Sequence, residues 1–239
     1  MRIALIFAFL FLALPAGAQE ITLSLGEGDS LAGRTMLTIA LLTVLSLAPG
    51  LAIMITCFPF IVTVLSILRQ AIGLQQSPPN MLIVSLAMFL TWFIMEPVFS
   101  EAWTVAVAPL IDGQIEIASA FNLGAAPFRG FMSGRIDPDT FTALLALRPE
   151  PAFDGAIADA PLSVLVPSFM LSEVSRAFEI GFLIYLPFLI IDLVVSAVLM
   201  SMGMMMVPPA VVALPFKLAF FVVADGWALV SGALVRSYF

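Results

Sequence analysis

Histidine is absent from the 239-residue chain and cysteine occurs only once, which excludes much side-chain chemistry at the outset. Without histidine there is no Ser-His-Asp triad, no haem ligation by histidine and little scope for a zinc site. Cys57 cannot form a disulfide within the chain. It stands in an apolar run, where a small buried hydrophobic residue is favoured over a reactive thiol. We therefore expect no catalytic residues, no metal, no cofactor and no enzyme.

Charge is also scarce, with 10% of residues charged against roughly a quarter in ordinary soluble domains. Because 62% of residues are apolar, the chain has too little polar surface to cover a globule in water, which indicates a membrane protein. No basic run occurs and Lys217 is the only lysine, so nucleic-acid binding is not expected. The net charge of −7 is concentrated in one segment, since half of the sixteen acids lie between Glu101 and Asp159.

The first 18 residues have the pattern of a cleavable signal peptide. Arg2 supplies a positive start, Ile3–Leu14 is an apolar stretch, and small residues end at Ala18, after which cleavage is expected. The apolar stretch is shorter than the roughly 20 residues that span a bilayer. An uncleaved first helix is the alternative. Cleavage would leave residues 19–34 as an exported N-terminal segment.

Residues 35–99 predict a first hydrophobic helical hairpin. The run from Thr35 to Leu68 is uncharged, and Pro49-Gly50 is expected to end or kink its first piece. Arg69 closes the run, a polar turn containing Pro78-Pro79 follows, and Met81–Met95 forms the return. Positive charges favour the cytoplasmic side, which places this turn inside the cell.

The acidic segment, residues 100–166, is then expected on the periplasmic side as a small helical region. Asp137-Pro138 has the composition of a helix start, which predicts a helix over Asp139–Leu147.

Residues 167–239 predict a second hydrophobic hairpin. Ser168 is the expected cap of its first helix, and Ile180–Met206 carries no charge except Asp192. After Pro208-Pro209, the stretch Val211–Leu234 predicts a return helix. The expected fold is thus an all-α membrane protein with two long, kinked hydrophobic hairpins and a small helical periplasmic segment between them.

The two hairpin turns share the pattern G-x-x-x-x-P-P, beginning at Gly73 and at Gly203. A glycine can end a helix in the left-handed conformation, and a proline can begin the next helix. The pattern indicates a weak parallel repeat, although coincidence is the alternative. A true repeat would place both turns on the same side.

Five of the thirteen methionines fall within Met200–Met206, at the second turn. Methionine usually fills cores, but a turn beside glycine and two prolines is an unusual place for core. Because methionine is unbranched and adaptable, a ring of such turns could form a deformable gasket that excludes water and ions. A thioether copper site is disfavoured, because no cysteine or histidine accompanies the sulfur atoms.

Asp192 lies twelve residues before Met204, and Lys217 lies twelve after Met205, so an antiparallel hairpin places the two charges at the same depth. A buried pair that fixes helix register is favoured over a proton relay. The alternative function is an ion-coupled carrier or proton channel that uses Asp192, Lys217 or Asp225. Glu173 lies near the start of the second hairpin, where it could make subunit contacts.

Several runs together resemble the FliP family of flagellar type III export-gate proteins and its injectisome relatives. The resemblance covers nearly all of the chain after the signal sequence. It rests on S-E-V-S-R-A-F-E-I-G-F, P-F-L-I-I-D-L-V-V, M-S-M-G-M-M-M-V-P-P, L-P-F-K and D-G-W in the second hairpin, and on L-A-P-G, F-P-F, L-R-Q-A-I-G and Q-Q-S-P-P-N in the first.

This resemblance implies a pore-forming core subunit that exports unfolded flagellar subunits and is needed for flagellum assembly. The implied assembly is a helical ring of five copies with FliQ and FliR. It works with further export proteins in the bacterial inner membrane at the flagellar basal body, lying largely on the periplasmic side. The resemblance implies a gasket at the pore entrance, which maps here to Met204, Met205 and Met206. It also implies a pore-facing aromatic, Tyr185, and buried charges or subunit contacts at Asp192, Lys217 and Glu173.

Overall fold

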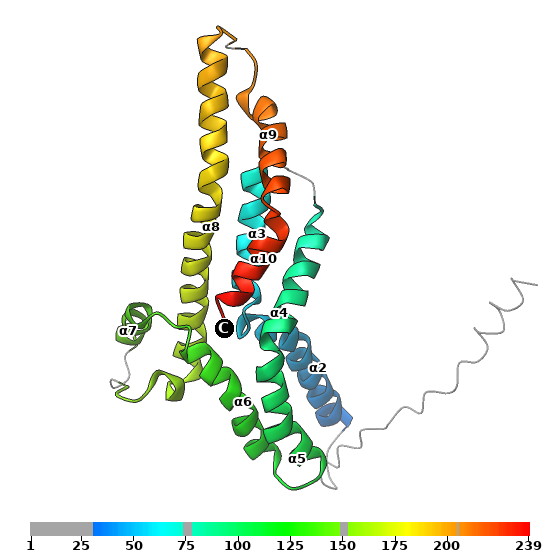
Figure 1. Ribbon diagram of the computed structural model, residues 1–239. Coiled ribbons are helices and arrows are strands. Elements are labelled where there is room, and N and C mark those ends of the chain that lie inside the picture. Colours follow the sequence, from blue (N-terminus) through cyan, green and yellow to red (C-terminus); the bar gives the residue numbers. More distant parts are fainter. Residues whose placement is uncertain (1–30, 74–77, 149–152, 205) are drawn as a thin grey trace, which may run out of the picture. The chain divides into compact units, whose positions relative to one another are not determined.

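The computed structural model describes residues 31–73, 78–148, 153–204 and 206–239, and within these ranges every regular element is a helix (Figure 1). The expected signal peptide and its cleavage position, Ala18, lie outside them. Residues 1–47 and 48–239 form separate units. The elements are α2 (Leu31–Met54), α3 (Phe58–Ile72), α4 (Asn80–Ala102), a π-helix (Trp103–Val107), α5 (Ala108–Ile111), α6 (Ile117–Ser133), α7 (Pro138–Ala146), a 3₁₀ turn (Ile157–Asp159), α8 (Leu162–Ser201), α9 (Pro209–Val223) and α10 (Gly226–Arg236).

Of the two outcomes expected at Pro49-Gly50, an end of the helix is wrong, because α2 continues through Pro49 to Met54. Just after the helix ends, the carbonyl of Ile53 accepts from both the N–H and the hydroxyl of Thr56, at 3.3 and 2.9 Å. Proline in the first turn of α3 then starts the next helix, since its missing N–H is not needed there. One internal proline removes a single hydrogen bond, which a long apolar helix tolerates.

The larger core is centred on α3, whose buried residues recur with helical spacing and pack mainly on α8. The two helices run parallel and approach closely at Gly181, where an added Cβ would lie 2.4 Å from Cδ1 of Ile67. Helices α4, α9 and α10 also contribute buried residues to this core. Its fully or nearly fully buried members include Phe60, Ile61, Leu65, Leu68, Ala87, Met95, Ala177, Phe188 and Leu234.

The helix expected to start at Ser168 begins instead at Leu162, after Pro161. Ser168 is fully buried inside α8, which passes through Pro167 and Pro187 without ending. The extra turns are held by a second core, in which Leu165 and Phe169 pack against residues of α6 and α7. Burial of these apolar side chains outweighs the hydrogen bond that Pro167 removes.

The acidic segment is helical, as expected, and α7 begins at the predicted cap. A carboxylate oxygen of Asp137 accepts a 2.8 Å hydrogen bond from the N–H of Thr140, which lowers the pKa of this carboxyl group. The expected boundary between residues 99 and 100 falls inside α4, and the helical run continues through a π-helix to Ile111.

The return helix expected over Val211–Leu234 is wrong, because it breaks into α9 and α10 with a bend of 60°. Asp225 adopts the left-handed conformation, with φ of 47°, and Gly226 follows it. Asp tolerates this region better than most residues. The break turns α10 so that Val230 and Leu234 reach the larger core.

Gly226→Ala is expected to destabilise the chain by roughly 1–3 kcal/mol, the cost typical of overpacking. An added Cβ would lie 2.1 Å from the ring of Phe221, which is held by an edge contact with Trp227. Thermal unfolding of the detergent-solubilised protein measures the effect. Gly130→Ala is the control, because that exposed α6 glycine has open space around its Cβ position and should be neutral or stabilising. Equal unfolding temperatures for the two variants would contradict the prediction.

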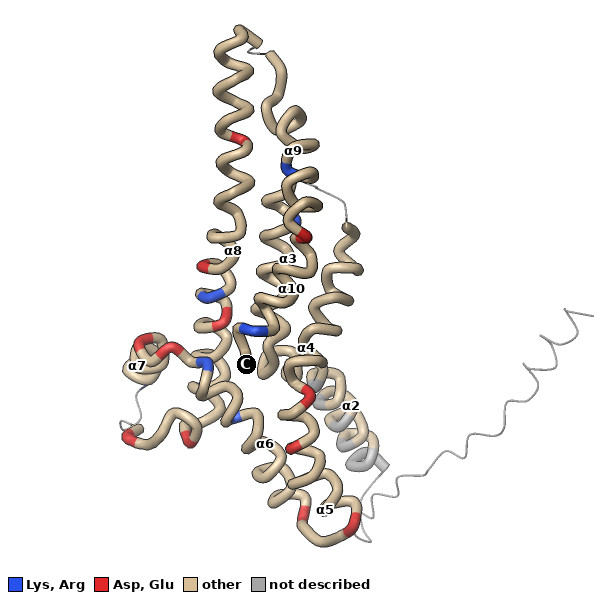
Figure 2. Tube along the Cα trace, viewed as in Figure 1, with Lys and Arg blue, Asp and Glu red and all other residues tan. Residues whose placement is uncertain are grey.

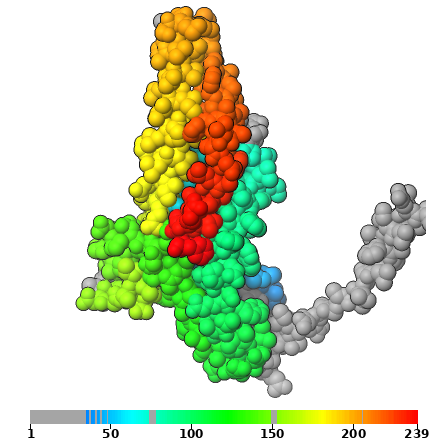
Figure 3. Space-filling view, viewed as in Figure 1, coloured from blue at the N-terminus to red at the C-terminus, as the bar shows by residue number. Residues whose placement is uncertain are grey.

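Two helical runs among the described residues are long and apolar enough to cross a membrane, namely Asn80–Ile111 and α8, and up to four spans result if each bent pair counts as one. Charged residues are sparse along the distal part of α8 and along α9, and they gather around α6 and α7 (Figure 2). The hairpin of α8 and α9 projects as a narrow arm (Figure 3).

Candidate functional site

The methionine turn at the end of α8 closes through a Schellman motif. The N–H of Met204 donates to the carbonyl of Leu199, and the N–H of Gly203 donates to that of Met200. This motif needs a left-handed residue, which Gly203 supplies with φ of 71°. Pro208 and Pro209 then start α9.

The first hairpin ends its helix in the same way. Gly73 caps α3 with φ of 89°, and Pro79 stands immediately before α4. Arg69 donates to the side chain of Asn80, which ties the two helices together across this turn. Because α3 and α8 run parallel, both helices end toward the same side (Figure 1). The local geometry expected from the G-x-x-x-x-P-P pattern is therefore present in both hairpins.

The described methionines of the turn are not core residues of the chain. Met204 is 42% exposed and Met206 is 97% exposed, and Met200 and Met202 are also exposed. Met205 lies outside the described residues. These flexible thioether side chains are thus available to a neighbouring surface rather than used to fill the interior.

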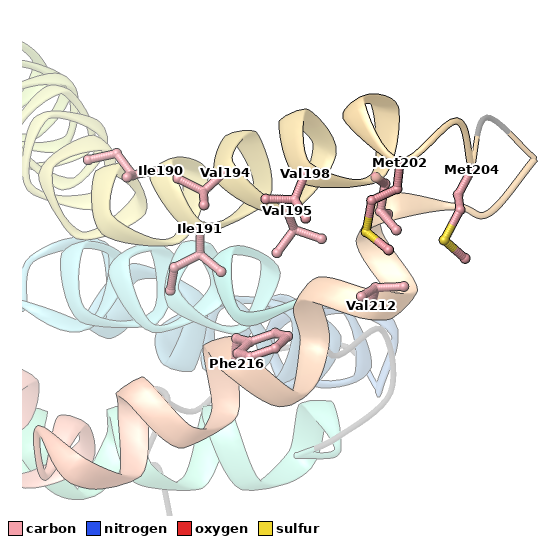
Figure 4. Close-up of a pocket in the computed structure, with 10 residues that line it drawn as sticks. Ile190, Ile191, Val194, Val195, Val198, Met202, Met204, Val212 and Phe216 are labelled. Carbon is pink, nitrogen blue, oxygen red and sulfur yellow. The ribbon is translucent and has the colours of Figure 1, made fainter.

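An apolar recess of about 580 Å³ lies beneath the turn, between the end of α8 and the start of α9 (Figure 4). Met202 and Met204 point toward it from the turn, Val195 and Val198 line it from α8, and Phe216 closes it from α9. Because every lining side chain is apolar, water has little to bind there. The recess gives the methionine turn room to move without breaking polar contacts.

Asp192 and Lys217 are brought together below this recess. The Lys217 ammonium lies 2.6 Å from Oδ2 of Asp192, and the two side chains are 7% and 30% exposed respectively. The same ammonium donates a 3.1 Å hydrogen bond to the carbonyl of Ala71, in the last turn of α3. A cation there also compensates the negative end of the helix dipole. Lys217 therefore joins α8, α9 and the turn end of α3.

The position of this pair sets the length of the projecting arm. Beyond Asp192, α8 continues for nine residues to Ser201, or about 14 Å at the rise of an α-helix. Helix α3 ends beside Lys217, since the Cβ position of Gly73 lies 3.9 Å from Nζ. The end of α8 thus extends past the end of α3.

Glu173 is fully buried and belongs to a separate charged cluster within the chain. Its Oε1 accepts from Nε of Arg135 at 3.0 Å and lies 3.5 Å from Arg176, and its Oε2 accepts from the Tyr238 hydroxyl. The structure therefore places Glu173 against intrachain partners and away from Lys217.

Two other candidates stand apart from these clusters. Tyr185 is half-buried and packs against the larger core, and Asp225 is exposed at the break between α9 and α10. The ion pair of Lys217 is made with Asp192, not with Asp225.

Comparison with known proteins gives a consistent result. A model of the FliP family matches residues 41–234. The chain belongs to the FliP family. It is 49% identical to the flagellar biosynthetic protein FliP of Caulobacter vibrioides over 230 residues, which cover 94% of this chain and 85% of that protein. It is 47% identical to the Agrobacterium fabrum FliP over 95% of both chains, and 45% identical to that of Bacillus subtilis over 85% of this chain and 92% of the relative. The resemblance inferred from the sequence runs is confirmed.

Sequence reasoning missed two residues of the Glu173 cluster, Arg135 and Tyr238. Both lie far from Glu173 in the chain, and neither belongs to a run that carries the resemblance to the FliP family. One signal was available in the sequence, namely the small number of charged residues. An arginine that is buried in such a chain is costly without a hydrogen-bond partner, so each arginine is a candidate for an internal contact. Arg129 behaves in the same way, because its guanidinium donates to the carbonyls of Ala158 and Ala160.

Proposed function

We propose that this FliP-family chain is a pore-forming core subunit of the flagellar type III export gate. In this role it is needed for export of unfolded flagellar subunits and hence for flagellum assembly. The observation that supports this most directly is the exposed methionine turn at the tip of the projecting α8–α9 arm, above an apolar recess. Repeated around a ring, the side chains of Met204, Met205 and Met206 would form a gasket at the pore entrance. Tyr185 would face the pore.

The proposed assembly is a ring of five copies together with FliQ and FliR, in contact with further export-apparatus proteins. Support comes from α8, whose 40 residues extend about 60 Å, twice the hydrocarbon thickness of a bilayer. Large apolar side chains remain exposed along it, and lipid cannot cover all of them. They are Leu171, Phe178, Phe182, Leu183, Leu189, Ile190, Leu193, Val194, Val198 and Met200.

The proposed location is the inner membrane at the flagellar basal body, with much of the assembled protein on the periplasmic side. An excess of apolar helix over membrane thickness fits such a placement, because neighbouring subunits would cover what the bilayer does not. The alternative of an ion-coupled carrier is less well supported. Lys217 is committed both to Asp192 and to the carbonyl of Ala71, an arrangement suited to joining helices. We therefore propose a structural role for these charges in place of ion transport.

Purification of the full chain with its FliQ and FliR partners tests this function. Electron microscopy should show a closed ring that contains several copies, and the gene should restore swimming to a strain that lacks its own FliP-family gene. A chain that restores swimming only as a monomer outside such a ring would contradict the proposal. An assembly that conducts ions but does not support export would favour the carrier.

A further inference from the structure

The C-terminal tail after α10 occupies the place where the two cores meet. The ring of Tyr238 stacks on Phe131 at 5.9 Å between centroids and makes an edge contact with Phe60 at 5.6 Å. Phe131 packs against both cores, whereas Phe60 belongs to the core centred on α3. The tail therefore touches the hairpin side and the acidic-segment side at once.

Arg135, in the link between α6 and α7, holds this tail by two different contacts. Its Nη1 donates a 2.8 Å hydrogen bond to the carbonyl of Ser237, and its guanidinium lies 4.0 Å from the centroid of the Tyr238 ring. The same guanidinium donates from Nε to Glu173 on α8. One side chain thus joins three segments that are far apart in the sequence.

The Tyr238 hydroxyl closes the cluster by donating to Oε2 of Glu173. Burial, followed by the nearby carboxylate, raises the pKa of this phenol, so it stays protonated and able to donate. Glu173 is fully buried, and each of its oxygens has a donor. Because a buried carboxylate is costly without such partners, removing the tail leaves Glu173 short of one of them.

We propose that residues 237–238 act as a strap that locks the α6–α7 link onto the hairpins and positions the Glu173 carboxylate. Arg135 and Tyr238 are its positioning residues. The strap adds to two other attachments of this segment to α8: the N–H of Asp137 donates to the Ser172 hydroxyl, and Ile136 and Phe141 pack against α8 in the second core. This proposal does not depend on the export role.

Hydrogen exchange of the full-length, detergent-solubilised protein tests the strap. Deleting Tyr238 and Phe239 is expected to speed exchange of amides between Ile136 and Phe141 by about tenfold, because local opening no longer breaks the strap contacts. Arg135→Met should have a similar effect. Tyr238→Phe keeps the ring contacts and should give a smaller rise at the same amides.

Deletion of Phe239 alone is the matched control, since this residue is 79% exposed and should leave exchange unchanged. Amides of α9 serve as an internal reference. The strap is overturned if deleting Tyr238 and Phe239 leaves the α6–α7 link unchanged, or if exchange rises equally in α9. Should the deletion variant fail to fold, Tyr238→Phe decides alone: an unchanged link in that variant also overturns the proposal.

Discussion

Replacing Met204, Met205 and Met206 together with alanine is expected to raise ion leakage through the assembled gate by roughly tenfold, because a shortened apolar ring no longer dewets the constriction. The side chains of Met204 and Met206 are exposed on the chain surface. Their truncation therefore removes apolar surface that could contact a neighbouring subunit, and it leaves the chain's own core intact. Leakage would be measured as ion flux into vesicles that contain the purified FliP-family ring with its partners.

Two comparisons separate a gasket from a general loss of packing. Leucine at the same three positions keeps apolar volume, so its leakage should stay closer to that of the natural sequence. Met88→Ala removes an exposed methionine from α4, away from the turn, and should not change leakage. If leakage is the same in every methionine variant, the turn does not seal the pore.

Local signals in the sequence indicate where α3, α7 and α8 begin or end. Gly73 and Gly203 end helices because only a residue free of a Cβ clash takes up the left-handed conformation without cost. Asp137 starts α7 because its carboxylate reaches a backbone N–H three residues ahead. In each case the deciding interaction spans a few residues, so composition and spacing contain it.

The incorrect predictions concern helix ends that depend on contacts between residues far apart in the sequence. Pro49 was expected to end or kink a helix and Ser168, directly after Pro167, to cap one, yet all three lie inside helices. For Pro167 the distant packing partners of the second core decide the outcome. The break at Asp225 was missed because it depends on how α10 reaches the core of α3. Tertiary contacts override local propensity in such cases, and one sequence does not display them.

For the candidate site, too, contacts set by local spacing could be predicted and contacts between distant residues could not. Spacing alone placed Asp192 and Lys217 at one depth, and the structure adds that the ammonium also binds α3 through Ala71. Two of the partners of Glu173 were not predicted, because Arg135 and Tyr238 lie 38 and 65 residues away. Together the two charged clusters fix α8 at two depths, and beyond Asp192 the described residues that face the recess are apolar. This arrangement is compatible with the gasket role proposed above.

Asp192→Asn is expected to destabilise the detergent-solubilised chain by about 3 kcal/mol, since it leaves a buried ammonium without its counter-ion. Lys217→Met should cost less, because the Asp192 side chain is 30% exposed, whereas that of Lys217 is 7% exposed. The double variant should recover part of the loss, as two coupled residues do in a double-mutant cycle. Glu179→Gln, at an exposed acid on the same helix, should change stability by less than about 0.5 kcal/mol.

The measured quantities are the unfolding temperature and the yield of assembled ring. A structural pair predicts that both fall together in Asp192→Asn and that both partly return in the double variant, because removing the second charge also removes the unpaired ion. A proton or ion carrier predicts a different result: Asp192→Asn assembles normally but abolishes ion flux, and Lys217→Met does not restore it. Normal assembly of Asp192→Asn, with flux lost, would therefore reject the structural role and favour transport.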